Sequence, residues 1–317
     1  MSDHRRALAL LLAFALLWLA PSLGAAAQPY RFAIVPPTAD SPFFQAIRDG
    51  CGERARQVTG VTCLYAAPGG EEKRSQAQLL RDLVKEGIDG IALSPDPTQE
   101  TAQAIDEAVA AGVPVVTFDA DLPRTRRQAF IGTNAKDFGR TLGQSVKRWK
   151  PKGGTFVILT ADPTLPNLSE RIAGIRDALS TGSWSEAKES PVVTDGTFVD
   201  AVRMMDQTLA RRPDLDVVFS VGAWPMLAPE DWRAMVAKYK PRIDQAQTVL
   251  VVADALPAQK ALVREGLGHV LVGQRPGDMG VKAVDLLLDL KKGRKVPEVV
   301  YVGFDTFTRL DLIKPGG

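Results

Sequence analysis

The sequence has 317 residues, with 39 Lys and Arg against 37 Asp and Glu, so its charges nearly cancel. This balance argues against a protein that binds nucleic acid or an anionic membrane through its overall charge. Without a leader, the length corresponds to roughly two domains of about 150 residues each.

The first 27 residues have the pattern of a secretory signal peptide. Arg5 and Arg6 form a basic start, residues 7–20 are almost entirely apolar, and residues 25–27 are small alanines that suit cleavage. The apolar run is shorter than the about 20 residues that a transmembrane helix needs, so an uncleaved membrane anchor is the less favoured alternative. We therefore expect export to the periplasm.

Beyond the leader, short runs rich in Val and Ile alternate with amphipathic stretches. Continuous apolar runs of this kind predict strands that are covered on both faces. Gly87, Gly112 and Gly266 lie where the intervening helices should end. The sequence therefore predicts an α/β fold with parallel sheets. The predicted strands are 32–35, 90–93, 113–118, 129–131, 156–159, 217–219, 249–252 and 270–272.

Ligands of open parallel sheets bind beyond the carboxyl ends of the strands, so the residues after each run are site candidates. After the first run, Ser41 is expected to cap a helix that has Pro42 at its first position. Phe43 and Phe44 then fall in the first turn, where an aromatic face can stack on a sugar ring. The alternative is that both phenylalanines belong to the core.

Two cysteines, Cys51 and Cys63, remain in the exported part. The segment between them is expected to contain the end of a helix, a stop at Gly60 and the next strand. Because an exported protein meets an oxidising compartment, we expect a structural disulfide between them. Two buried free thiols are the alternative.

Further candidates follow later strands. Asp119 offers a carboxylate to hydroxyl donors, with a turn-capping role as the alternative. Asn167 and Arg171 open a helix, and Arg171 can present its fork of donors to ligand oxygens unless it lies on the surface. Trp224 lies in a loop between Gly and Pro, where a core role explains it poorly.

Two polar residues complete the set. Asp254 and Gln274 follow the strands at 249–252 and 270–272. Carboxylates, an arginine, an amide and aromatics at successive strand ends suit a neutral ligand with many hydroxyl groups.

At these residues the chain resembles the bacterial periplasmic sugar-binding proteins of the ribose- and galactose-binding type. Residues 41–44, Ser-Pro-Phe-Phe, are similar to the family's Asn-Pro-Phe-Phe. Residues 117–119 are similar to its strand-end Asp motif, and residues 169–174 to its Arg-x-x-Gly helix, whose arginine contacts sugar. Asp254 and Gln274 match two later polar contacts, the second of them at the hinge.

The resemblance implies two doubly wound parallel-sheet lobes joined by a multi-strand hinge, with Gly132-Thr133-Asn134 as one candidate crossing. The first lobe is expected at 28–132 plus about 275–303, and the second at 133–274 plus about 304–317. The protein would be a monomer without cofactor or metal that hands its ligand to the permease of an ABC transporter.

The chain departs from the family pattern at two places. Ala120 stands where an arginine is common, and the loop at 222–225, Gly-Ala-Trp-Pro, replaces the usual Asn-Asp. The loop resembles a subgroup with a Gly-Trp-Pro sequence whose members are also thought to bind sugars. The departures leave the ligand unidentified.

Other functions fit the sequence less well. A sensor that partners a membrane histidine kinase or chemoreceptor would use the same groove and stays open. A repressor would carry a helix-turn-helix where the leader lies. An enzyme is not expected, because His269 is the only histidine after the leader and no catalytic motif is present. Asp119 and Asp121 lie too close together on one loop to act across a ligand as a glycosidase pair.

Overall fold

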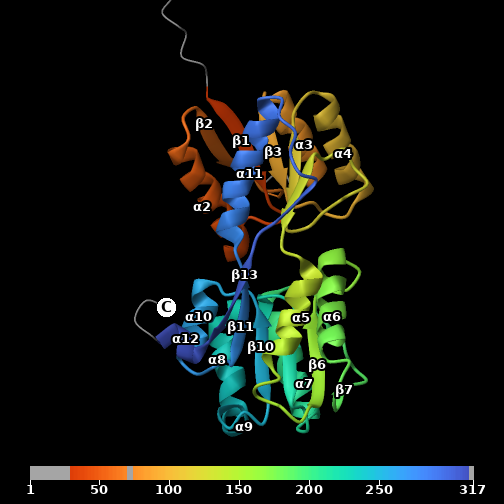
Figure 1. The fold of residues 1–317 in the computed structure, drawn as a ribbon, viewed down its shortest axis with the longest axis vertical. Helices are drawn as coiled ribbons and strands as arrows, with labels where there is room; N and C mark the ends of the chain where they lie inside the picture. The colour runs from red at the N-terminus through yellow and green to blue at the C-terminus, as the bar shows by residue number, and fades with distance from the viewer. Residues whose placement is uncertain (1–28, 70–73, 314–317) are drawn as a thin grey trace, which may run out of the picture.

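The computed structural model describes residues 29–69 and 74–313, and the predicted signal peptide lies outside the described residues. Figure 1 shows two lobes that are stacked along the long axis and joined by several chain segments. Among the described residues, no helix combines the length and the hydropathy needed to cross a membrane.

The first lobe contains a six-stranded sheet in the order β12-β5-β4-β3-β1-β2, in which every pair is parallel. Its inner strands carry few polar side chains, because helices cover both faces. The strands are β1 (Tyr30–Val35), β2 (Val61–Tyr65), β3 (Gly90–Leu93), β4 (Val115–Phe118), β5 (Ala129–Gly132) and β12 (Val299–Tyr301).

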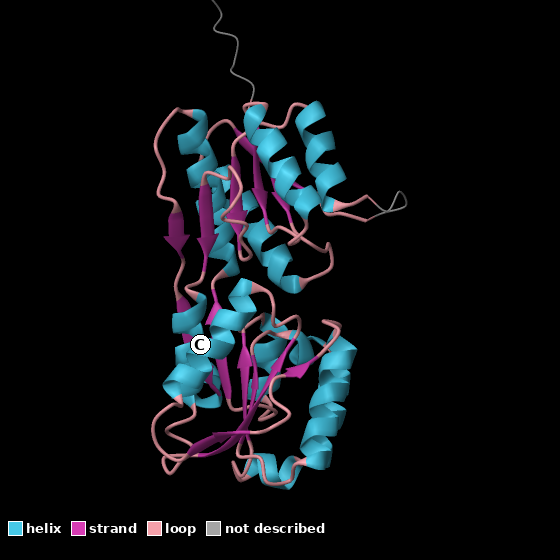
Figure 2. Ribbon diagram, turned by 90° about the vertical axis from the view of Figure 1, so that its right-hand side faces the viewer, coloured by secondary structure: helices cyan, strands magenta, loops and turns pink. Residues whose placement is uncertain are grey.

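Alternate residues of these strands pack into two separate cores. Phe32 and Ile34 face a cluster with helices α2 (Pro42–Gln57) and α11 (Pro276–Lys291), whereas Ala33 and Val35 face α3 (Gln76–Lys85) and α4 (Gln99–Ala110). This burial on both faces is the reason for the unbroken apolar runs. Figure 2 shows the same helix–sheet–helix layering from the side.

The second lobe contains a seven-stranded sheet with the path β13-β11-β10-β9-β6-β7, and β8 pairs with β6. All pairs are parallel except β11 with β13, which is antiparallel. The strands are β6 (Gly154–Thr160), β7 (Trp184–Glu186), β8 (Val192–Val193), β9 (Val217–Ser220), β10 (Val249–Ala253), β11 (Val270–Gln274) and β13 (Phe304–Thr308).

Helices again cover both faces of this second sheet. One face packs against α5 (Ala135–Ser145) and α6 (Pro166–Ala178). The opposite face packs against elements that include α7 (Phe198–Arg211), α8 (Pro229–Lys238) and α10 (Pro257–Arg264). Three short elements complete the lobe: the 3₁₀ helix η1 (Trp224–Leu227), α9 (Lys240–Asp244) and α12 (Arg309–Ile313).

The chain passes between the two sheets three times, after β5, after β11 and after β12. The crossings touch: the Val302 N–H donates to the Gly132 carbonyl at 2.8 Å. The lobes also meet through apolar side chains, since Ala223 and Leu256 of the second lobe are buried in the α2 and α11 core of the first.

The predicted fold class is confirmed, and each predicted apolar run lies within a strand or overlaps one. The three predicted helix-ending glycines lie just beyond α3, α4 and α10, with φ angles of 73°, 83° and 84°. Four strands, β7, β8, β12 and β13, are not predicted from the sequence, because each is short or lies at a sheet edge and contains exposed residues.

Candidate functional site

Two carboxylates stand immediately after central strands, one in each lobe. Asp119 follows β4 and Asp254 follows β10, and both have left-handed backbone, with φ of 59° and 70°. Among L-residues, Asp and Asn tolerate this conformation best, and such positions concentrate at functional sites. The Asp119 N–H donates to the Ile131 carbonyl (3.0 Å) and the Asp254 N–H to the Val272 carbonyl (2.7 Å), so neighbouring strands hold both turns.

Arg171 reaches the site from the second turn of α6, and its position depends on close helix packing. A Cβ at Gly139 of α5 would lie 2.1 Å from the Arg171 carbonyl oxygen, and one at Gly174 would lie 2.2 Å from that of Lys136. Only glycine allows α5 and α6 to approach this closely, which explains the glycine three residues after the arginine.

The Arg171 guanidinium is buried, with 4% of the residue exposed. Its Nη1 donates to the Val221 carbonyl at 2.8 Å, and its Cζ lies 4.8 Å from the centre of the Phe138 ring. Its Nε is buried without a hydrogen-bond partner. Because a buried donor without a partner is costly, this guanidinium is prepared for acceptor oxygens that a ligand would bring.

Arg171 lies within electrostatic reach of both carboxylates. Burial raises the pKa of Asp119 to about 6, the Arg171 guanidinium lowers it, and the Asp254 carboxylate raises it. Burial also raises the pKa of Asp254, which Arg171 and hydrogen bonds from Gln274 and the Ala223 N–H counteract. Asp119 remains partly open to solvent, whereas Asp254 is buried. A single guanidinium cannot neutralise two carboxylates. Asp119 and Asp254 therefore remain strong hydrogen-bond acceptors for the hydroxyl groups of a ligand.

Gln274 and Trp224 belong to the same edge of the second sheet. The Gln274 Nε2 donates to Asp254 Oδ1 at 2.8 Å, which orients the carboxylate. Trp224 begins η1, is partly exposed, and packs against the cores on both faces of the sheet, so it covers the carboxyl end of that sheet. The Trp224 ring lies over Gly222, where a Cβ would be 2.5 Å from it.

The two phenylalanines divide their roles. Phe43 is buried in the core, while Phe44 is partly exposed. The Phe44 ring centre lies 5.4 Å from that of Phe43 and 6.3 Å from that of Phe118, the residue before Asp119. Of the pair, Phe44 is therefore the one placed to meet a ligand, and Phe43 supports it.

Ser41 and Asn167 are less closely tied to this group. Ser41 is the N-cap residue of α2, as expected, although its hydroxyl makes no capping bond. Asn167 Oδ1 accepts from the Leu168 N–H at 3.0 Å. Within the described residues, no hydrogen bond links either side chain to Asp119, Arg171 or Asp254.

The second carboxylate of the Asp119 loop has a structural role. Asp121 accepts from Arg127 at 2.7 and 2.9 Å and from the Thr117 hydroxyl at 2.6 Å. Both Asp121 carboxylate oxygens are therefore engaged within the first lobe. Phe138, whose ring lies against the Arg171 guanidinium, is not predicted from the sequence, because an aromatic residue on another helix gives no local signal.

A disulfide joins Cys51 in α2 to Cys63 in β2, with a Cα–Cα distance of 6.1 Å. It fastens the helix to the edge strand of the first sheet, so it is a structural link. In the residues that the structure describes, no group of three or more His, Cys, Asp or Glu side chains is arranged to hold a metal ion.

Comparison with known proteins decides the family, because the sequence profile described as "Periplasmic binding protein domain" matches residues 32–295. The chain belongs to the periplasmic binding protein family. This binding protein is 26% identical to the D-allose-binding periplasmic protein of Escherichia coli over 88% of its length and 89% of the relative's. It is 22% identical to the ribose import binding protein of Bacillus subtilis, with 89% and 88% covered.

A solved structure gives the same result for this binding protein. The solute-binding protein of an ABC transporter from Burkholderia graminis, in complex with D-arabinose, superposes with a TM-score of 0.81 at 25% identity, covering 91% of this chain and 98% of that one. Membership of this family makes the chain a ligand binder and not an enzyme, as the sequence predicts.

Proposed function

We propose that the protein captures a small neutral sugar or polyol between its two lobes and delivers it to the permease of an ABC transporter. The names of its relatives support this, since they include D-allose- and ribose-binding proteins and a transporter's solute-binding protein with D-arabinose. The predicted leader and the periplasmic relatives support export to the periplasm.

The observation that carries the proposal is the meeting of side chains from both lobes around one arginine. Asp119 comes from the first lobe, whereas Arg171 and Asp254 come from the second, and all three interact electrostatically. A sugar hydroxyl can donate to a carboxylate while its oxygen accepts from the guanidinium, so this trio suits a polyol.

Capture would follow from this division. With the lobes apart, each half presents only part of the contacts. A ligand that touches both halves binds the closed arrangement more tightly and shifts the population toward it. We assign the first lobe to residues 28–132 with 275–303 and the second lobe to residues 133–274 with 304–317. We expect the mature protein to be a monomer.

A thermal-shift screen of the purified mature protein tests the proposal. The panel contains pentoses, hexoses and inositols, with amino acids and divalent metal ions as negative controls. A ligand at 100 times its Kd stabilises the fold by about 2.7 kcal/mol, which such a screen resolves. Stabilisation by at least one sugar or polyol is expected, and stabilisation by amino acids or metal ions alone would refute the proposal.

The screen should include Asp119→Ala and Arg171→Ala. Both variants are expected to fold and to lose the shift given by the ligand. Undiminished binding in both would show that the ligand site lies elsewhere.

A further inference from the structure

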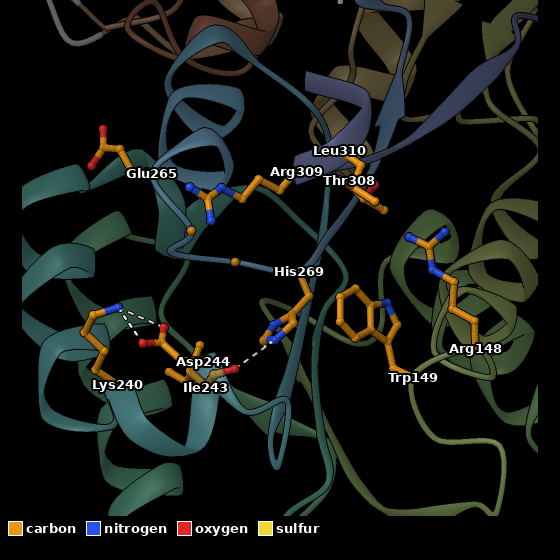
Figure 3. Close-up of a pocket in the computed structure, with 12 residues that line it drawn as sticks. Arg148, Trp149, Lys240, Ile243, Asp244, Glu265, His269, Thr308, Arg309 and Leu310 are labelled. Carbon is orange, nitrogen blue, oxygen red and sulfur yellow. Dashed lines mark hydrogen bonds and ion pairs between the residues drawn. The ribbon is translucent and has the colours of Figure 1, made fainter. Parts of the chain in front are cut away.

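A large groove lies in the second lobe, away from the strand ends that carry Asp254 and Gln274. Its volume is about 800 Å³. Figure 3 shows it, with the rings of His269 and Trp149 side by side, Lys240 and Asp244 beyond His269, Arg148 beyond Trp149, and Arg309 and Leu310 above the two rings in this view. We call it the distal groove.

The distal groove lies at the amino end of the second sheet. His269 directly precedes β11, whereas Gln274 ends this strand. Five strand residues at about 3.3 Å each place the two sites roughly 15 Å apart. Because the lining residues belong to one lobe, opening or closing of the interlobe cleft leaves the groove in place.

The floor of the groove is rigid and aromatic. His269 Nδ1 accepts from the Leu250 N–H at 3.0 Å, and its Nε2 lies 3.1 Å from the Ile243 carbonyl oxygen. Burial lowers the pKa of His269, so the ring is neutral and both nitrogens are engaged. The Trp149 ring packs edge-on against it at 5.0 Å and remains 37% exposed. Exposed, fixed tryptophans are frequent anchors of protein interfaces.

Two arginines are the charged residues of the groove that can pair with a ligand. Arg148 lies over the Trp149 ring at 5.6 Å, and Arg309 Nε donates to the Arg264 carbonyl at 3.0 Å. Neither guanidinium has a carboxylate partner within the described residues. The acids of the groove are already engaged, since Asp244 pairs with Lys240 and Glu265 with Arg233. The available charge is therefore positive.

The shape favours a polypeptide over a small molecule. Small-ligand sites enclose most of the ligand, whereas here the walls are themselves open to solvent. Leu310 is 68% exposed and Ile313, on the same short helix, is 57% exposed. Trp149 and Leu310 supply apolar surface to the groove, and Arg148 and Arg309 supply two guanidinium groups that have no carboxylate partner among the described residues.

We propose that the distal groove binds an acidic, partly apolar segment of a partner protein. Carboxylates of the segment pair with Arg148 and Arg309, and an aromatic or aliphatic side chain packs on Trp149 and Leu310. Since the groove is independent of the cleft, the partner holds the protein in both its open and its closed form.

The test uses the mature protein and two fluorescein-labelled twelve-residue peptides. One alternates Asp and Glu with Leu and Phe, and the other carries Lys in place of each acid. Fluorescence anisotropy is expected to show saturable binding of the acidic peptide, weakened by salt. Arg148→Ala with Arg309→Ala should weaken it at least tenfold, and the glutamate versions of both substitutions should reverse the preference toward the basic peptide.

The matched control replaces Arg124 and Arg126 in the first lobe, whose exposed guanidinium groups also lack a carboxylate partner in the described residues; the Arg126 backbone N–H donates to Asp106, and this bond does not depend on the side chain. This double alanine variant should bind the acidic peptide as the parent does. Equal weakening by both double variants would reduce the effect to overall charge and overturn the proposal. So would the absence of peptide binding, or selective binding of phosphatidylglycerol vesicles at the groove in place of the peptide.

Discussion

Replacing Arg171 by Met removes the cation of the interlobe site and keeps most of the side-chain volume. The guanidinium offers its unpaired Nε and its Nη2 to a ligand, while Nη1 donates to Val221. Each hydrogen bond to a charged group contributes about 1.5–3 kcal/mol. The loss of two such bonds predicts a Kd that is at least about 100 times higher.

The same substitution should change the folding free energy much less. The variant loses the hydrogen bond to the Val221 carbonyl. It also loses the cation–π contact with Phe138, and this contact contributes about 0.5–2 kcal/mol. It also removes a buried donor without a partner, whose presence costs about 1–3 kcal/mol. These terms oppose one another, so the free energy of unfolding should fall by less than about 2 kcal/mol.

Isothermal titration with the sugar found by the screen measures the affinity, and urea unfolding measures the stability. Arg127→Met is the matched control, because this arginine is also buried but pairs with Asp121. Breaking a buried pair costs about 3–5 kcal/mol, so the control should lose stability and keep its affinity. A Kd for Arg171→Met within threefold of the parent would refute the reasoning.

Three further predictions follow from the site and its supports. Burial raises the pKa of Asp119 to about 6, and ligand hydroxyl groups donate to its ionised form. The affinity for the ligand should therefore fall about tenfold per pH unit below pH 6. Calorimetry that shows constant affinity from pH 7 to pH 5 would contradict this. Gly139→Ala should cost about 1–3 kcal/mol in urea unfolding, because its Cβ meets the Arg171 carbonyl. Gly52→Ala should not destabilise, because its Cβ would meet only the end of the Arg56 side chain, at 3.6 Å. Cys51→Ser should lower the unfolding free energy by about 2–4 kcal/mol and leave sugar affinity unchanged.

The sequence predicts the central strands because burial on both faces leaves a strong local mark. Runs such as Val249–Ala253 are fully buried, so their composition alone identifies them. The edge strand β12 shows the opposite case: Val299 and Tyr301 are exposed, and three residues give no periodicity to detect. An edge strand such as β12 forms because the folded sheet offers it a neighbouring strand, and its own residues do not record that neighbour.

The site could be predicted in part for a similar reason. Strand ends mark Asp119, Asp254 and Gln274, since parallel strands bring their carboxyl ends to one edge. No local rule separates Asp119 from Asp121, which lies two residues away but is taken up by Arg127. The division between Phe43 and Phe44 likewise depends on which side of α2 packs inward, and only the assembled fold decides it.

The return of α11 and β12 to the first lobe affects how the chain can be made and divided. Gly50 of α2 fits against the Gly277 backbone, and Gly280 against that of Ile47, so the first helix in the described residues needs one of the last for its packing. A ribosome or export channel that releases the chain from its amino end cannot complete this lobe before almost the whole protein has emerged. For the same reason, no single cut would separate the two halves into self-sufficient fragments.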